Sequence, residues 1–106
     1  MSKSDWERIF TALHDRLRRR LLIALLKQES HSGRIIVPEE IHEGEKELDE
    51  LQVELFHEHL PLLEDANFIN WDRNTHEVAT GSDFSHIRPV LELLHNSQEN
   101  LPDGWV

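Results

Sequence analysis

The sequence predicts a mainly α-helical domain with a small β-hairpin, an α+β fold, on three observations. Apolar side chains recur at helical spacing over most of the chain, and the β-branched run at 34–37 suits a strand. The fourteen residues from His59 to Asp72 have the pattern of a helix end, a reversal at Asn67 and a strand. At 106 residues the chain is long enough for one domain with a core and too short for two.

Helical signals dominate the first third of the chain. Ser4 and Glu7 form a capping box, so a helix is expected to begin near Asp5. A second cap at His14–Asp15 allows either one bent helix or two helices, and the polar stretch Gln28–Gly33 ends the second segment. The apolar stripe consists of Trp6, Ile9, Phe10, Leu13, Leu17, Leu21, Ala24 and Leu25.

A short helix and then a long one are predicted after the strand. Pro38 suits the first turn of a helix, so residues 38–43 form the short one, which Gly44 ends. The long helix is expected from Glu45 or Lys46 to about Asp65. Its buried side is predicted to hold Leu48, Leu51, Leu55, Phe56, His59, Leu62 and Leu63. Its outer side is predicted to hold Asp49, Glu50, Gln52, Glu54, His57, Glu58 and Pro61.

The rest of the chain predicts a hairpin, a helix and a tail. Segments 68–72 and 76–80 flank a very short turn and form the hairpin. Residues 81–83 end the sheet and cap a last helix, whose apolar stripe is Phe84, Ile87, Val90, Leu91 and Leu94. Pro89 fits this helix if it starts only near Ile87. Residues 5–95 are thus assigned to the domain and 96–106 to a flexible C-terminal tail, with docking of Trp105 as the alternative.

This order of elements is that of a winged helix-turn-helix domain with an additional C-terminal helix. The segment from His59 to Ile69 resembles the H-L-x-x-L-E-x-A-G-h-h segment of winged-helix regulators, ArsR-like ones and above all a haloarchaeal winged-helix family. Asn67 stands where that family usually has Gly. Residues 13–20 are similar to the family's A-L-x-x-x-R-R-R motif, and the resemblance covers about residues 5–95. It implies a transcriptional regulator whose long helix enters the major groove of DNA.

The chain is strongly acidic, with 21 acidic against 11 basic residues and a net charge of −10. Of the basic residues eight are Arg and three are Lys. Such a surface suits a salt-rich cytoplasm, where self-repulsion is screened, and favours a halophilic archaeal source over an ordinary acidic protein. Disulfides and thiolate metal sites are excluded because Cys is absent. The longest apolar run, 21–26, is too short to cross a bilayer and no secretion signal is recognisable, so we expect a cytoplasmic protein.

Five residues are candidate contacts to duplex DNA. They are Lys46, Gln52 and His57 on the predicted long helix and Arg73 and Asn74 at the hairpin turn. Acidic residues outnumber them, because the same helix contributes Glu45, Glu47, Asp49, Glu50, Glu54 and Glu58. Phosphates are repelled by such a face, so the alternative is a solvated acidic helix that touches no DNA.

The chain has one cluster of basic residues, at positions 16 to 20. Arg16, Arg19 and Arg20 share a helix face, which is expected to contact phosphates, an acidic partner or a second subunit. The alternative is that these side chains pair within the chain, because most of the acidic residues follow this segment.

The terminal helices hold more apolar surface than a core of this size must bury. We therefore predict a homodimer, as in related winged-helix regulators, with the alternative that the last helix packs on its own core. The predicted interface residues are Trp6, Phe10, Phe84, Ile87, Leu91 and Leu94.

Neither a metal site nor an active site is predicted. His57 and His59 are two residues apart, so on a helix they point about 200° apart and do not grip one ion. The sequence has no Gly-rich phosphate loop, nucleophile elbow or Cys, which argues against an enzyme and against a cofactor.

Two functions are therefore compared. The first is a DNA-binding transcriptional regulator that acts as a homodimer. The second is a protein-interaction module whose acidic helix docks a basic partner, without DNA, for example within a transcription assembly. A continuous basic strip beside the hairpin favours the first and an unbroken acidic surface favours the second.

Overall fold

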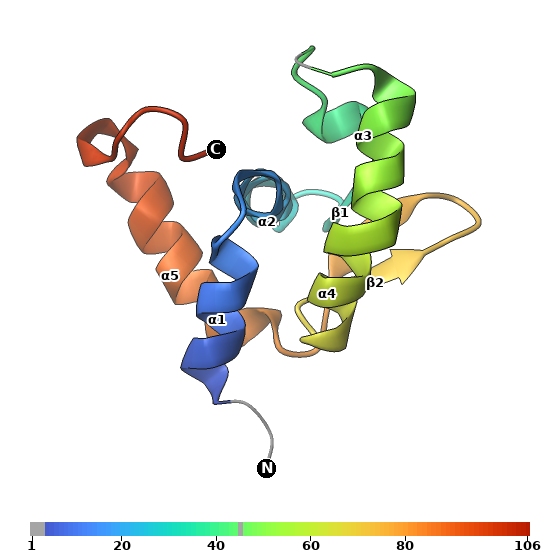
Figure 1. The fold of residues 1–106 in the computed structure, drawn as a ribbon. Coiled ribbons are helices and arrows are strands. Elements are labelled where there is room, and N and C mark those ends of the chain that lie inside the picture. Colours follow the sequence, from blue (N-terminus) through green and yellow to red (C-terminus); the bar gives the residue numbers. More distant parts are fainter. Residues whose placement is uncertain (1–3, 45) are drawn as a thin grey trace.

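The computed structural model describes residues 4–44 and 46–106, which form an α+β structure (Figure 1). The described elements follow in the order α1 (Asp5–Leu13), α2 (Arg16–Gln28), β1 (Arg34–Ile36), the 3₁₀ turn η1 (Glu39–Ile41), α3 (Leu48–Glu54), the π-helical turn η2 (Leu55–His59), α4 (Leu60–Asp65), β2 (Ile69–Asp72), β3 (Glu77–Thr80), α5 (Phe84–Asn96) and the 3₁₀ turn η3 (Gln98–Asn100).

The first helical region is two helices, each with the predicted cap. The Ser4 hydroxyl accepts a hydrogen bond from the Glu7 amide at 3.2 Å, at the start of α1. The Asp15 carboxylate accepts from the amide of Leu17 at 2.8 Å, at the start of α2. Each cap satisfies an amide that has no partner inside its helix, so the chain turns between the helices without losing these bonds.

The sheet has the antiparallel order β1-β3-β2, so that β3 lies between the two other strands. Val78 in β3 faces Ile35 in β1 and Trp71 in β2. The predicted hairpin is confirmed, with strands that start one residue later than expected. The reversal before it is also confirmed, since Asn67 has a φ of 64°, in the left-handed region that Asn tolerates.

Helices α3, η2 and α4 form one continuous helical segment, Leu48–Asp65, called the long helix below (Figure 1). It begins two residues after Lys46; Glu45, the other predicted start, lies outside the described residues. Leu48 is exposed, contrary to the prediction, because it stands at the first position of the helix. The end at Asp65 is confirmed.

Helix α5 begins at Phe84, directly after the predicted cap at residues 81–83. The condition placed on Pro89, a start only near Ile87, was wrong, because Pro89 lies inside the helix. Pro89 has no amide hydrogen to donate to the carbonyl of residue 85, so one helical bond is missing. This loss is compensated by burial, since Phe84, Ile87 and Leu91 are all fully enclosed in the core.

The core lies around α2, which Figure 1 shows end-on between α5 and the long helix. Fully buried side chains from the helices, the sheet and the segment between them meet there, namely Leu21, Leu22, Leu25, Ile35, Leu55, Leu60, Leu63, Phe68, Phe84, Ile87 and Leu91. Helices α2 and α5 each span 13 residues. Within the described part of the chain, no helix has both the length and the apolar character needed to cross a membrane.

The C-terminal segment 96–106, for which the sequence predicts a flexible tail, folds back onto the domain in the structure. Trp105 and Val106 pack against the core, and their carbonyls accept hydrogen bonds from arginines of α2. Docking of Trp105, the alternative that the sequence allowed, is therefore what the structure has.

Candidate nucleic-acid interface

The predicted DNA contacts lie along the long helix and at the tip of the β2–β3 hairpin. Lys46 precedes the helix and is exposed, as is His57, while Gln52 is half-buried. Arg73 and Asn74 are exposed in the turn between β2 and β3. The helix and the turn are joined directly, because Arg73 Nη2 lies 3.0 Å from Glu64 Oε1 on α4.

Arg73 is fixed by a second contact in addition to this ion pair. Its guanidinium carbon lies 4.1 Å from the centre of the Trp71 ring, in a cation–π arrangement. The Trp71 ring in turn lies 5.0 Å from the Phe56 ring on the long helix. These aromatic contacts hold the hairpin against the helix, and Arg73 is directed toward the helix.

The tip of the hairpin has a defined backbone. The Asp72 carboxylate accepts hydrogen bonds from the amides of Asn74, at 2.8 Å, and Thr75, at 3.3 Å. The Asn74 amide is the main cause that lowers the pKa of Asp72, followed by that of Thr75. This is the turn geometry that an Asp at this position favours, and it presents the Asn74 side chain to solvent.

Lys46 is held by the long helix that it was expected to extend. Its Nζ forms an ion pair with Glu54 Oε1, which raises the pKa of Lys46. The same pair is the main cause that lowers the pKa of Glu54, and a hydrogen bond with His59 adds to it. Both predicted cations of the interface, Lys46 and Arg73, therefore have a carboxylate partner on the long helix.

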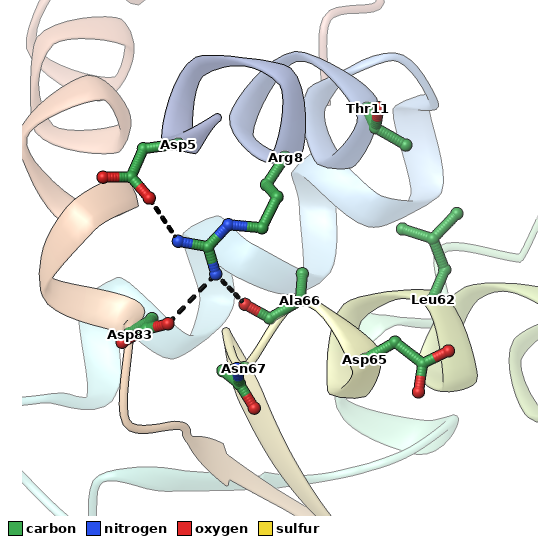
Figure 2. A pocket seen from close by; sticks show the side chains of 8 residues that line it. All are labelled: Asp5, Arg8, Thr11, Leu62, Asp65, Ala66, Asn67 and Asp83. Atoms are coloured by element: carbon green, nitrogen blue, oxygen red, sulfur yellow. Dashed lines mark hydrogen bonds and ion pairs between the residues drawn. The ribbon is translucent and has the colours of Figure 1, made fainter. Parts of the chain in front are cut away.

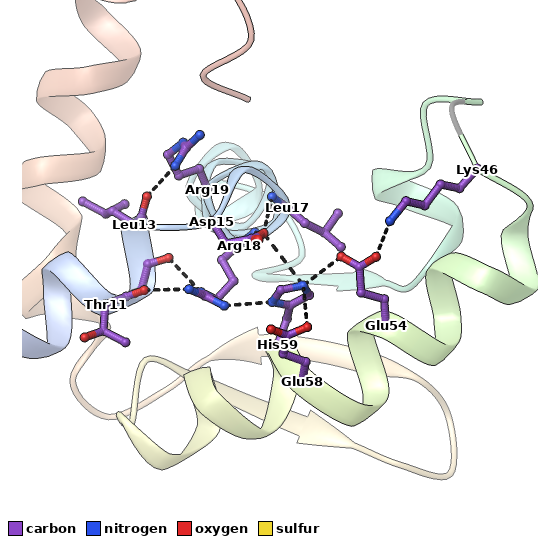
Figure 3. Close-up of polar contacts among 11 residues, drawn as sticks. Thr11, Leu13, Asp15, Leu17, Arg18, Arg19, Lys46, Glu54, Glu58 and His59 are labelled. Carbon is purple, nitrogen blue, oxygen red and sulfur yellow. Dashed lines mark hydrogen bonds and ion pairs between the residues drawn. The ribbon is translucent and has the colours of Figure 1, made fainter.

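The second oxygen of Glu54 leads to a buried polar network (Figure 3). Glu54 Oε2 lies 3.0 Å from His59 Nε2, and His59 Nδ1 lies 2.9 Å from Arg18 Nη1. Arg18 also donates to the carbonyls of Thr11 at 2.9 Å and Ala12 at 3.2 Å. A guanidinium only donates, so Nδ1 is the acceptor and the ring hydrogen is on Nε2, which donates to Glu54.

Arg18 and His59 are only 5% and 1% exposed. The sequence predicts the burial of His59 correctly, but Arg18 was missed as a functional or structural residue. A signal existed, because Arg18 lies three and four residues before Leu21 and Leu22, on the apolar side of α2. The network ties the end of α1, the start of α2 and the middle of the long helix together.

A π-helical turn brings His59 into this network. The Leu60 amide donates to the Leu55 carbonyl, five residues earlier, and Pro61 follows with no amide hydrogen to donate. The wider turn thus ends just before the proline. Two further carboxylates, of Asp15 and Glu58, each lie 3.8 Å from His59 Nε2, so the ring is surrounded by acceptors.

The basic cluster on α2 is engaged inside the chain. Arg19 donates to the carbonyls of Leu13, at 2.6 Å, and Trp105, at 2.5 Å. Arg16 donates to the Val106 carbonyl at 3.1 Å, and Arg20 forms a 3.0 Å ion pair with Glu43. These contacts agree with the internal role that the sequence offered as the alternative to phosphate or partner binding.

The predicted dimer interface is corrected by the packing of α5. Phe84, Ile87 and Leu91 lie in the core of the single chain, so they have no surface to offer a partner, and Leu94 is half-buried. Trp6 and Phe10 are 59% and 64% exposed, with stacked rings 5.5 Å apart. Leu93, which the sequence did not single out, is 66% exposed on the outer side of α5.

A pocket of about 600 Å³ lies between α1 and the end of α4, and Arg8 is one of the side chains that line it (Figure 2). Arg8 Nη1 donates to the Ala66 carbonyl at 2.6 Å and to Asp83 at 3.0 Å, and Nη2 pairs with Asp5. The side chain thus joins α1, the end of the long helix and the start of α5, which is a structural role.

The outer face of the long helix is acidic. Asp49, Glu50 and Glu58 are exposed there, and Asp65 is exposed at the helix end. No group of three or more His, Asp or Glu side chains in the described part of the chain is placed to hold a metal ion. Comparisons with protein families, with characterised proteins and with solved structures find no match to this chain.

Proposed function

We propose that the protein is a winged-helix transcriptional regulator that binds duplex DNA as a homodimer and needs no cofactor. The observation that supports this best is the order of elements together with the β1-β3-β2 sheet. The hairpin follows the long helix directly and lies beside it. A winged helix has this topology, and its long helix reads the major groove while the hairpin contacts the flanking backbone.

Charge sets the conditions under which such binding occurs. The acidic face of the long helix opposes phosphates at low salt, where charges act over about 10 Å or more. In molar salt the range falls to about 3 Å, and the repulsion is confined to direct neighbours. The proposal therefore expects DNA binding in concentrated potassium chloride, as in the cytoplasm of a halophilic archaeon.

The test is a fluorescence-anisotropy titration against random and genomic duplexes in potassium chloride from roughly 0.2 to 3 M, a range over which the screening length shrinks to about 3 Å or less. Binding is expected, with Lys46→Glu and Arg73→Glu each weakening it about fivefold or more. Lys27→Glu, which makes the same charge change at an exposed position of α2, is the control. A folded protein that binds no duplex anywhere in this range contradicts the proposal.

The homodimer is supported by the exposed aromatic pair Trp6 and Phe10 on α1. Large stacked aromatic rings in contact with water are a feature of interaction surfaces more than of solvated ones. We expect a two-chain mass by sedimentation at micromolar concentration and a one-chain mass for the double variant Trp6→Glu, Phe10→Glu. Val53→Glu replaces another exposed apolar residue, on the long helix, and is the matched control. A one-chain mass for the unmodified protein contradicts this part of the proposal.

A second candidate is a protein-interaction module that docks a basic partner. It is favoured by one observation, that both cations at the interface are paired while Asp49, Glu50 and Glu58 stay exposed. In that case the folded protein binds a lysine-rich peptide and no duplex, and charge reversal at Glu50 abolishes the peptide binding.

A further inference from the structure

The two cations of the proposed DNA interface share an arrangement. Lys46 is paired with Glu54, and Arg73 is paired with Glu64 at 3.0 Å. Both carboxylates belong to the long helix, the element that is proposed to face DNA. A carboxylate and a phosphate present similar anionic oxygens to a lysine or an arginine, so they compete for the same hydrogen-bond donors.

We propose that Glu54 and Glu64 are internal competitors of DNA phosphates, so that binding exchanges one anionic partner for another and depends little on salt. This inference rests on the proposed DNA-binding function and concerns the regulation of that same site. Glu54 and Glu64 thereby lower the affinity without contacting DNA.

The exchange is possible because the pairs are exposed. The side chains of Arg73 and Glu64 are 59% and 32% exposed, and those of Lys46 and Glu54 are 49% and 29% exposed. Exposed ion pairs contribute little net free energy, because water solvates the separated charges well. A phosphate in a polyanion can therefore displace either carboxylate at small cost.

The salt dependence of the DNA affinity provides a measurement of this exchange. Each phosphate that a protein cation neutralises releases about 0.9 counterion, so the two contacts of each chain alone contribute about −1.8 to the slope of log affinity against log salt. Here each contact also frees a carboxylate, which lies among other acids and attracts potassium ions in turn. Uptake of potassium ions by the freed carboxylate offsets the release of counterions from the DNA. The slope of log affinity against log salt therefore becomes shallower.

Glu54 and Glu64 are not equally suitable for testing the exchange of carboxylate for phosphate. Glu54 also accepts from His59, whose ring is linked to buried Arg18, so its replacement disturbs the fold. Glu64 pairs with Arg73 on the surface and lies outside this network. Glu64→Gln is therefore the informative variant, because it frees Arg73 and leaves the buried network intact.

Asp65 provides a matched control for Glu64. It is the next residue, is exposed at the end of the same helix, and makes no ion pair within the described residues. Asp65→Asn changes the net charge as Glu64→Gln does but frees no cation. Any effect of general charge is therefore common to both variants, and a difference between them reports the freed Arg73.

The experiment measures affinity for a random-sequence duplex by anisotropy across the potassium chloride range, for the unmodified protein and both variants. We expect Glu64→Gln to bind about twofold more tightly than Asp65→Asn at the lowest salt at which both bind, and to steepen the slope by at most about 0.9 for each Arg73. Adding Arg73→Gln to Glu64→Gln should remove both changes.

The outcomes separate the two proposals. If the unmodified protein and both variants bind duplex DNA with the same slope, the exchange is wrong while the DNA-binding function stands. If no variant binds in any salt while circular dichroism shows a folded chain, the DNA-binding function is wrong and the exchange falls with it. A merely structural Glu64 would lower the melting temperature in Glu64→Gln and leave the salt slope unchanged.

Discussion

Arg18 and Arg73 are both held by a side chain of the long helix, but their surroundings differ. Arg18 is 5% exposed and donates to His59 and two carbonyls, whereas the Arg73 side chain is 59% exposed and pairs with Glu64. Because water is excluded from Arg18, every hydrogen-bond donor of its guanidinium depends on a protein partner. Arg73 is solvated and exchanges one hydrogen-bond partner for another freely. The same residue type is structural in one place and available for binding in the other.

The largest expected effect on stability comes from replacing Arg18, the buried arginine of the two. Arg18→Met keeps an extended side chain but removes the donor to three acceptors, on Thr11, Ala12 and His59, of which the Thr11 carbonyl keeps only the His14 amide. We expect the free energy of unfolding to fall by about 3 kcal/mol or more, measured by urea denaturation. Arg34→Met, at an exposed ion pair with Glu77, should cost less than about 1 kcal/mol. Equal losses for both variants would contradict the comparison.

A smaller effect is expected at His59, where two replacements separate hydrogen bonding from packing. His59→Leu fills similar space but leaves Arg18 without one acceptor, which should cost about 2 kcal/mol in urea denaturation. His59→Gln keeps an oxygen that accepts from Arg18, so a smaller loss is expected. The role assigned to the Arg18–His59 contact is refuted if the Gln variant is the less stable of the two.

The pH dependence of stability tests the role of Glu54, which lies between the buried network and the surface. Lys46 first, and then His59, hold the pKa of Glu54 below its ordinary value of 4.5. The folded state therefore favours the carboxylate, and its contribution is present above pH 4.5 and lost as the pH falls through the lowered pKa. Glu54→Gln should be less stable than the unmodified protein at pH 7, with a difference that shrinks toward pH 3. A constant difference in urea denaturation across this range would show that the carboxylate charge has no part in it.

The smallest effect is expected on the exposed side. Glu64→Gln should change the free energy of unfolding by about 0.5 kcal/mol or less, because the pair with Arg73 is solvated and Trp71 still holds the guanidinium. Thermal unfolding of this variant and of Asp65→Asn should give nearly equal midpoints. A loss comparable to that of His59→Leu would mean that the hairpin depends on this ion pair.

Local signals predicted most of the elements. The caps at Ser4 and Asp15, the reversal at Asn67 and the hairpin lie where short-range chemistry puts them, because each depends on neighbours a few residues away. The cap at residues 81–83 likewise predicts the start of α5 at Phe84. The expectation that Pro89 requires a start near Ile87 was wrong, since tertiary burial outweighs the local cost of Pro89.

The candidate site was predicted less well, for a physical reason. Sequence patterns place Lys46 and Arg73 near the proposed interface but do not show that Glu54 and Glu64 neutralise them. Pairs such as Arg18 with His59, 41 residues apart, depend on how separate elements pack. For the same reason, the apolar residues of the terminal helices were assigned wrongly between core and surface. Only packing decides that Ile87 is buried and Trp6 is exposed.

The π-helical turn at Leu55–His59 shifts the angular phase of the long helix. Each residue of an α-helix advances by about 100°, so one extra residue in a turn rotates everything that follows by about that angle relative to a single helical wheel. The half before the turn therefore presents Asp49 and Val53 outward on one phase, and the half after it turns Leu60 and Leu63 inward on another. Removing one residue between Leu55 and His59 would bring the two halves into phase, and would swing either the core contacts or the outer face out of position.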